Sequence, residues 1–340
     1  MEKLKYERLI SKENISILEE SYNIQFTEIE QMFLGADRNT FVYKVSSSKG
    51  SVFLKIRTGY FDKFSVTIPY FLSQKIGKHI IEPLKTMQGD LFVTLKDETI
   101  ILYPFIQGLS AIKKPMTKNQ WIALGETLRK IHGLDFSLES EQIPRESFDA
   151  SQAHSQRRIL LKKYMKELHE KELKDEGTRE FIALLDEKSE IIKTIADRAE
   201  ELFSGIINSP HQYCLCHGDI HGGNIFITHG NNTENDFYIV DWDTLIMAPK
   251  ERDLMFIGGG VANIWNKPEE VSWFYEGYGE AEINQNLIDY YRCQRILEDI
   301  IEYYEQFFAE PKNGKNQKTI VQRVASGFYP GGVADAALGN

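Results

Sequence analysis

The sequence predicts an α+β fold, with a small N-terminal lobe that contains an antiparallel sheet and a larger, mostly helical C-terminal lobe. Two patterns support this prediction. From about residue 29 to residue 106, short apolar runs rich in β-branched residues alternate with polar turns, as in strands. After residue 106, long stretches carry apolar residues at helical spacing. A chain of 340 residues is long enough for two lobes, each with its own core.

Two helices are predicted in the N-terminal lobe. Residues 11–22 have apolar side chains on one face, and Ser11 suits the N-cap position. Residues 64–76 form the second predicted helix, which ends near Gly77. Within this segment Pro69 must lie in the first turn or kink the helix, because proline lacks the amide hydrogen that a helix interior uses.

The strands of this lobe are predicted as two pairs. Residues 41–45 and 52–56 are apolar and flank the polar turn 46–50, which is a hairpin pattern. Residues 91–95 and 99–103 form the second pair, and a short polar turn separates them.

The C-terminal lobe is predicted to be helical over three stretches: 119–132, which ends before Gly133; 155–204, with a break near 175–177; and 285–308. The segment 327–332 is rich in turn-forming residues. We therefore expect an N-terminal lobe at 1–103, a hinge at 104–108 and a C-terminal lobe at 109–340.

The composition limits the classes of function. A formal charge of −10 and a pI near 5.4 argue against a nucleic-acid-binding protein, which needs a basic face for phosphates. The acidity either aids solubility, which is the more ordinary interpretation, or attracts a cationic substrate. Three cysteines and no long apolar segment predict a cytoplasmic protein without disulfides or membrane contact. The absence of an evident heptad or apolar surface predicts a monomer.

The segment 213–243 carries the residues that indicate chemistry. His217-Gly-Asp219-Ile-His-Gly-Gly-Asn224 precedes a strand-like run, and a second run ends at Asp241-Trp-Asp243. A hairpin between the two runs would bring Asn224 beside Asp241. Carboxylate and amide oxygens are ligands suited to Mg²⁺, and a further carboxylate, Asp219, suits a base that accepts a hydroxyl proton. Phosphoryl transfer requires these groups.

These motifs resemble the signature of the aminoglycoside phosphotransferase and choline kinase family. The resemblance implies a bilobal, protein-kinase-like fold and an enzyme that uses ATP and Mg²⁺ to phosphorylate a hydroxyl group of a small molecule. Carried over by position, Asp219 would be the catalytic base, and Asn224 and Asp241 would be the Mg²⁺ ligands.

The same resemblance extends to the N-terminal lobe. Lys55 lies in the middle of a predicted strand and matches the family's lysine that contacts the α- and β-phosphates of ATP. The turn at 34–42 would cover the phosphates, with Asn39 and Thr40 as contacts. The run Tyr103-Pro-Phe105-Ile106 matches the hinge whose backbone would bind adenine.

Segments outside the catalytic motif resemble the spectinomycin phosphotransferases in particular, over about residues 5–335. These segments include 35–37, 248–260, 265–268 and 274–279. The resemblance predicts an aminocyclitol antibiotic as the substrate, and hence antibiotic resistance. The residues expected to contact the substrate are Asp253, Trp265, Tyr278, Glu298, Asp299 and Glu302, although the acidic ones would otherwise be read as a solvated helix face.

One departure from the family pattern concerns the partner of Lys55. A helix glutamate usually pairs with this lysine, but no glutamate occurs between Val52 and Ile81. Asp62 is the acidic residue in that interval and is therefore a candidate replacement.

Three alternatives stay open on the sequence alone. The chain could be a metabolic kinase of the same fold that acts on choline, homoserine or a thio-sugar. It could also be a nucleotide-binding pseudokinase that serves as a scaffold. Finally, Cys214 and Cys216 lie among several histidines, which suggests zinc, but no second ligand pair follows at finger spacing. We therefore expect both cysteines to pack in the core and His217 to hold the loop through backbone hydrogen bonds.

Overall fold

The computed structural model describes residues 10–32, 39–136, 142–148, 153–168, 175–207, 209–228, 236–309 and 314–339. The chain forms two compact units. The first contains Met1–Met116 and Gly223–Leu245, and the second contains Thr117–Gly222 and Ile246–Asn340. The segment 104–108, predicted as a hinge, thus lies inside the first unit. No described helix is long and apolar enough to span a membrane.

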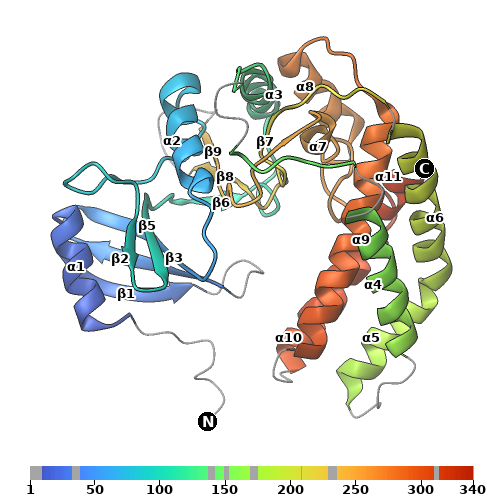
Figure 1. The fold of residues 1–340 in the computed structure, drawn as a ribbon, viewed down its shortest axis with the longest axis horizontal. Helices are drawn as coiled ribbons and strands as arrows, with labels where there is room; N and C mark the ends of the chain where they lie inside the picture. The colour runs from blue at the N-terminus through green and yellow to red at the C-terminus, as the bar shows by residue number, and fades with distance from the viewer. Residues whose placement is uncertain are drawn as a thin grey trace. The chain divides into compact units, whose positions relative to one another are not determined.

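The first unit contains a five-stranded antiparallel sheet in the order β1-β2-β3-β5-β4 (Figure 1). Its elements are α1 (Lys12–Tyr22), β1 (Phe26–Met32), β2 (Thr40–Ser47), β3 (Gly50–Thr58), α2 (Phe64–Ile76), β4 (Val93–Leu95) and β5 (Glu98–Pro104). Ser11 is the N-cap of helix α1, and its side chain accepts a hydrogen bond from the amide of Asn14. Leu18 and Tyr22 of this helix pack with one face of the sheet, on side chains such as Leu54 of the central strand.

A second, three-stranded sheet completes the first unit. It contains β6 (Gly108–Ser110), β8 (Ile225–Thr228) and β9 (Phe237–Ile239), in the order β6-β8-β9. Strands β8 and β9 form the antiparallel hairpin that the sequence predicted after the catalytic motif. Residues 229–235 between them lie outside the described residues.

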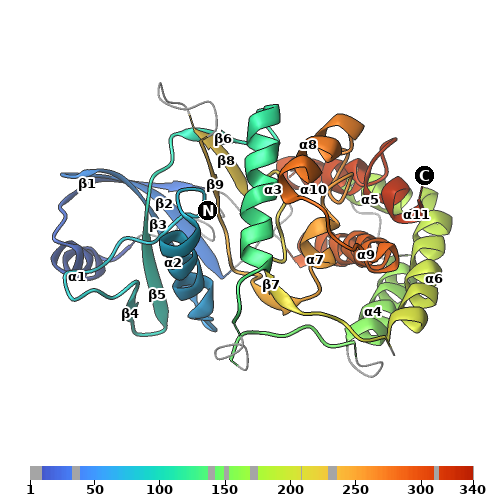
Figure 2. The ribbon, with the colours of Figure 1, turned by 90° about the horizontal axis from the view of Figure 1, so that it is seen from above.

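The second unit is mostly helical (Figures 1 and 2). Its elements are α3 (Lys118–His132), α4 (Ala153–Leu168), α5 (Glu176–Glu187), α6 (Ser189–Ile206), β7 (Cys214–Cys216), β10 (Ile246–Ala248), α7 (Glu251–Leu254), α8 (Pro268–Tyr278), α9 (Gln285–Ala309), α10 (Gly314–Ser326) and α11 (Val333–Leu338). Strands β7 and β10 pair antiparallel, so Cys216 lies opposite Ile246.

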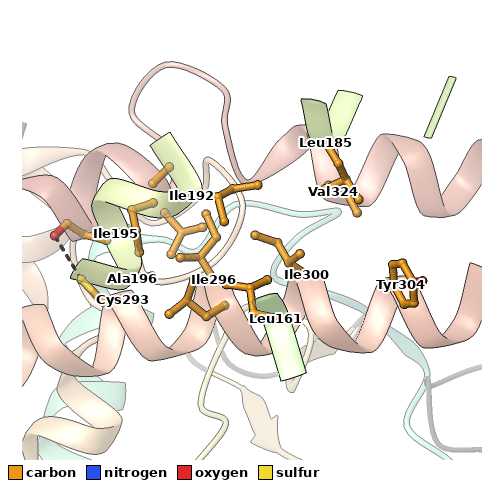
Figure 3. Close-up of a cluster of buried hydrophobic side chains, with 14 of the residues drawn as sticks. Leu161, Leu185, Ile192, Ile195, Ala196, Cys293, Ile296, Ile300, Tyr304 and Val324 are labelled. Atoms are coloured by element: carbon orange, nitrogen blue, oxygen red, sulfur yellow. Dashed lines mark hydrogen bonds between the residues drawn. The ribbon is translucent and has the colours of Figure 1, made fainter. Parts of the chain in front are cut away.

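The core of this unit lies along helix α9. Apolar side chains from α4, α5, α6, α10 and α11 gather around Ile296 and Ile300 (Figure 3). The Sγ atom of Cys293 lies in the same cluster and donates to the carbonyl of Ala337 at 3.5 Å. Burial of each such side chain contributes about 1.5–3 kcal/mol, and this core therefore holds the long α9 helix firmly in place.

Helices α3 and α8 cross at a close approach that requires glycine on both sides. A Cβ atom on Gly125 would collide with the backbone carbonyl of Phe274, and one on Gly277 would collide with the carbonyl of Ile122. Both positions lack a side chain because the two backbones are in contact there.

The predicted α+β fold is confirmed, since strands dominate the N-terminal part and helices the C-terminal part. Of the two alternatives given for Pro69, the first turn is excluded, because Pro69 lies in the interior of α2 and is buried there. Other features differ from the sequence-based expectation. Helices α8 and α10 were not predicted, and the α5–α6 break at Lys188 was missed as well.

Candidate active site

A first candidate group, in the first unit, lies around Lys55, which is in the middle of β3. The lysine side chain is buried, and only 8% of the residue is exposed. Its Nζ atom lies 3.1 Å from Oδ1 of Asp241 and 2.7 Å from Oδ2 of Asp243. Burial lowers the pKa of Lys55, but the two carboxylates outweigh it and raise the pKa above its ordinary value. The residue is therefore a fixed cation.

Asn224 and Asp241 are adjacent because of the β8–β9 hairpin. The amide of Val240 donates to the carbonyl of Asn224 at 3.0 Å, and Asp241 is the next residue. Asp241 has φ +61°, in the left-handed region that aspartate tolerates better than most residues. Its side chain remains 52% exposed. An amide oxygen and an accessible carboxylate on neighbouring backbone positions form a donor set that suits Mg²⁺.

Two further charged residues, which the sequence reasoning did not assign, complete this group. Asp243 contacts both Lys55 and Nη1 of Arg57, the latter at 3.2 Å. Arg57 also donates to the hydroxyl of Thr40 at 2.8 Å, and the carbonyl of Asn39 accepts from the amide of Thr58. The signal in the sequence was available: Arg57 follows Lys55 by two residues, so both point to the same face of β3.

The predicted adenine contacts divide between two environments. Tyr103 on β5 is half-buried, and burial raises the pKa of its hydroxyl. Phe105 and Ile106 line a cavity of about 560 Å³ together with residues of α2, β8 and β9, but Lys55 and Asp241 do not line it. This cavity therefore does not bring the hinge residues together with the charged group. Of the predicted phosphate-covering turn, Asn39 and Thr40 are described, but the residues before them, from 34 to 38, lie outside the described residues.

A second candidate group, in the helical unit, surrounds Asp219. Its Oδ1 atom accepts from Nη1 of Arg295 on α9 at 2.7 Å, and Oδ2 lies 3.4 Å from Nε2 of His221. Burial raises the pKa of Asp219, but the hydrogen bond from His221 and the charge of Arg295 outweigh it. The pKa is therefore held well below its ordinary value, and the carboxylate is ionised. The sequence did not indicate Arg295, because nothing local links it to residue 219.

The loop that carries Asp219 is held by a buried carboxylate. Asp253 of α7 is fully buried, and it accepts hydrogen bonds from the amides of His217 at 2.9 Å and Gly218 at 2.8 Å. It also accepts from Nε2 of His132 at 3.1 Å. The Nδ1 atom of His217 in turn accepts from the amide of Asp219, as expected for a histidine that holds the loop. Asp253 thus supports the loop, and burial leaves it no face for a substrate amine, contrary to the prediction.

Three predicted substrate carboxylates lie on one stretch of α9 near Arg295. Oδ1 of Asp299 forms an ion pair with Arg295, 3.2 Å from its Nε atom, and Glu302 accepts a hydrogen bond from Gln306 at 2.9 Å. Burial raises the pKa of Asp299 to about 6, and the charges of Glu298 and Asp219 act in the same direction, against the effect of Arg295. Four carboxylates thus influence one guanidinium, which leaves an excess of negative charge.

The two predicted aromatic contacts are part of the core instead. Trp265 is 5% exposed and packs edge-on against Trp121, with ring centroids 4.9 Å apart. Tyr278 is 1% exposed, and its hydroxyl contacts Nδ1 of His132 at 2.8 Å. Neither ring has a surface on which a drug ring could stack.

Asp62 does not take the place of the missing glutamate. Its carboxylate accepts from the amide of Phe64 at 2.9 Å, at the start of α2. The partners of Lys55 are instead the carboxylates of Asp241 and Asp243.

Comparison with known proteins finds relatives that share the fold of this chain. The chain is similar over its whole length to spectinomycin phosphotransferase APH(9)-Ia, in a crystal structure with ADP and spectinomycin: identity is 34%, 98% of each chain is covered and the TM-score is 0.87. A second structure of that enzyme, an AMP complex, gives 32% identity, coverage of 97% and 99%, and a TM-score of 0.84.

More distant structures share the fold. Choline kinase LicA from Streptococcus pneumoniae gives 16% identity, coverage of 93% and 97%, and a TM-score of 0.51. A search of curated protein sequences finds no significant match. The sequence signature of the phosphotransferase enzyme family matches residues 94–293, which is more than half of the chain. The chain therefore has the bilobal kinase-like fold and belongs to the aminoglycoside phosphotransferase (APH) family of phosphotransferase enzymes.

Proposed function

We propose that this protein is an ATP-dependent O-phosphotransferase that phosphorylates a hydroxyl group of an aminocyclitol antibiotic similar to spectinomycin, and that it confers resistance. The observation that carries the proposal is the 34% identity, over 98% of both chains, to an enzyme crystallised with ADP and spectinomycin. We further propose that residues 1–103 bind the nucleotide, that 104–108 act as the hinge and that 109–340 carry the catalytic and substrate-binding groups.

The residues of the first unit suit a nucleotide with its metal ion. Lys55, a buried permanent cation, would contact the phosphates, with Asn39, Thr40, Tyr103, Phe105 and Ile106 as the remaining nucleotide contacts. Asn224 and Asp241 would hold Mg²⁺, because their amide and carboxylate oxygens are the hard ligands this ion prefers. When bound, the ion neutralises charge on the phosphate oxygens. Asp243 would keep Lys55 and Arg57 oriented on the same face of β3.

Asp219 would orient the acceptor hydroxyl and take its proton. The hydroxyl oxygen bonds to the γ-phosphorus of ATP as the bond to ADP breaks, and the proton passes to the carboxylate. Because Arg295 and His221 hold the pKa of Asp219 low, the carboxylate is a weak base before the reaction. It therefore accepts the proton late, once the hydroxyl oxygen has become acidic by bonding to phosphorus.

The carboxylates on α9 favour a cationic acceptor. Asp219, Glu298, Asp299 and Glu302 outnumber the two guanidinium groups that act on them, those of Arg295 and Arg252. A substrate with protonated amines beside its reacting hydroxyl would restore the balance of charge, and antibiotics of the aminocyclitol class carry such amines.

The test is a coupled assay of ADP release with ATP and Mg²⁺, across spectinomycin, several aminoglycosides, choline and homoserine. The variants are Asp219→Ala and the control Asp197→Ala, which removes an exposed carboxylate on α6 that lies 3.8 Å from Lys193. We expect turnover of spectinomycin in the wild type and in the control, and none in Asp219→Ala.

Other outcomes would replace parts of the proposal. Turnover of choline or homoserine alone would identify a metabolic kinase and overturn the antibiotic substrate. Binding of ATP without turnover of any compound, together with no effect of Asp219→Ala in cells, would favour a pseudokinase scaffold.

A further inference from the structure

Three potential metal ligands meet in the helical unit, outside the groups assigned to phosphoryl transfer. Cys214 and Cys216 lie two residues apart on β7, so both side chains point to the same face of the strand. His132, the last residue of α3, provides the third donor. One ligand atom from each of these residues lies within 4.8 Å of the other two. The sequence spacing concealed this cluster, because the histidine comes from a helix far upstream.

The distance between the two sulfur atoms fits one metal ion. The Sγ atoms of Cys214 and Cys216 are 3.8 Å apart, and both cysteines are free. Two thiolates at about 2.3 Å from a tetrahedral Zn²⁺ ion are themselves about 3.8 Å apart. Each thiol also lies 3.6 Å from the carbonyl of Ala248 as a weak hydrogen-bond donor. Because these thiol hydrogen bonds are weak, their loss on metal binding would cost little free energy.

The histidine is already oriented as a metal ligand. Nε2 of His132 lies 3.1 Å from Oδ2 of Asp253, and Nδ1 lies 2.8 Å from the hydroxyl of Tyr278. In the neutral imidazole that binds a metal, Nε2 donates its hydrogen to the carboxylate, and Nδ1 keeps the lone pair that a metal ion can take in place of the hydroxyl contact. A carboxylate that fixes one ring nitrogen while the other binds the metal is the usual arrangement at zinc sites.

The donor set also selects the ion. Two cysteines and one histidine bind zinc in proteins and leave a fourth coordination position open. Thiolates favour Zn²⁺ and other thiophilic cations, whereas Mg²⁺ prefers oxygen ligands. Cys216 is fully buried and the side chain of His132 is only 4% exposed, but Cys214 is partly buried, so an ion would reach the cluster beside Cys214.

We propose that Cys214, Cys216 and His132 form a binding site for Zn²⁺ or a similar thiophilic divalent cation, separate from the groups assigned to Mg²⁺. Binding releases the thiol protons and fixes His132 against Asp253. Because Asp253 also holds the amides of His217 and Gly218, the bound ion would rigidify the loop that carries Asp219. The site does not depend on which substrate the enzyme phosphorylates.

The test uses Co²⁺ as a spectroscopic probe and needs no substrate. The full-length protein is treated with a chelator, kept reduced with a phosphine and titrated with Co²⁺ in the presence of excess Mg²⁺. We expect a thiolate-to-cobalt charge-transfer band in the near ultraviolet that saturates at a 1:1 ratio. Cys214→Ser should lose the band, whereas the control Cys293→Ser should keep it, because Cys293 lies in the α9 core.

A second measurement on the wild type guards against misfolding of a variant. X-ray absorption of the Zn²⁺-loaded protein should show two sulfur ligands at about 2.3 Å and a nitrogen ligand at about 2.0–2.1 Å. A wild type with no charge-transfer band, a band that persists in folded Cys214→Ser, or zinc with only oxygen and nitrogen ligands would each overturn the proposal.

Discussion

Replacement of Asp253 by asparagine should loosen the catalytic loop without changing the size of the side chain. The carboxylate accepts three hydrogen bonds, from the amides of His217 and Gly218 and from the ring of His132. Asparagine has one oxygen and one NH₂ group in place of the two carboxylate oxygens. At least one of the N–H groups that now donate to Asp253 would therefore face the NH₂ group, which cannot accept its hydrogen bond. The loss of a charged hydrogen bond and the unsatisfied amide together cost roughly 3 kcal/mol. This corresponds to about a hundredfold change in the unfolding equilibrium constant.

The assay combines urea unfolding with steady-state kinetics. Asp253→Asn should unfold at a lower urea concentration, and its kcat should fall by about tenfold to a hundredfold, because the loop no longer holds Asp219 in position. The KM for ATP should change little. The control is Asp62→Asn, at a half-buried position where one amide donates to the carboxylate, and its effect should stay within about 0.5 kcal/mol. The reasoning is refuted if Asp253→Asn unfolds at the wild-type urea midpoint.

Three further predictions concern other contacts. Gly277→Ala should destabilise the protein by about 1–3 kcal/mol, since its Cβ would enter the carbonyl of Ile122; calorimetry beside Gly205→Ala, where the added Cβ meets open space, measures the difference. Arg295→Gln should add an acidic limb to the pH profile of kcat, because the pKa of Asp219 rises once the guanidinium is gone. Arg295→Lys keeps a positive charge and should restore much of the wild-type profile. Identical pH profiles for Arg295→Gln and the wild type would contradict this. Burial lowers the pKa of His132, but the hydrogen bond with Asp253 outweighs it and raises this pKa above 6.5, so the pair stabilises the fold fully below about pH 6.5. This contribution to stability is lost as the pH rises through the pKa of the folded state. The unfolding temperature should therefore fall between pH 6 and pH 9, and it should fall less steeply in His132→Gln.

The sequence predicted best those features that depend on neighbouring residues. Alternating apolar residues and polar turns located the strand pairs of the N-terminal sheet, and helical periodicity located α1, α2, α3 and α9. The adjacency of Asn224 and Asp241 was predictable as well, because a hairpin converts a separation along the chain into a short distance. Helix α10 was missed because its apolar side chains are few.

Contacts between distant segments were not predictable in the same way. Arg295 follows Asp219 by a long stretch of chain, and only the packing of α9 brings its guanidinium to that carboxylate. Trp265 and Tyr278 were expected to face a substrate because of their residue types, but burial decides their role, and the sequence does not show which aromatic side chains are covered. The assignments of Lys55, Asn224 and Asp241 to nucleotide and metal stay predictions.

The left-handed backbone of Asp241 also restricts how this enzyme can change over evolutionary time. Glycine, asparagine and aspartate adopt a φ of +61° at low cost, whereas other side chains are strained there. Only aspartate among these three brings a negative charge. Selection on the backbone alone thus leaves three tolerated residues at this position, and selection on activity chooses among them. Lineages of this fold that lose catalysis should therefore carry glycine or asparagine here more often than any other residue, which would mark them in a sequence survey.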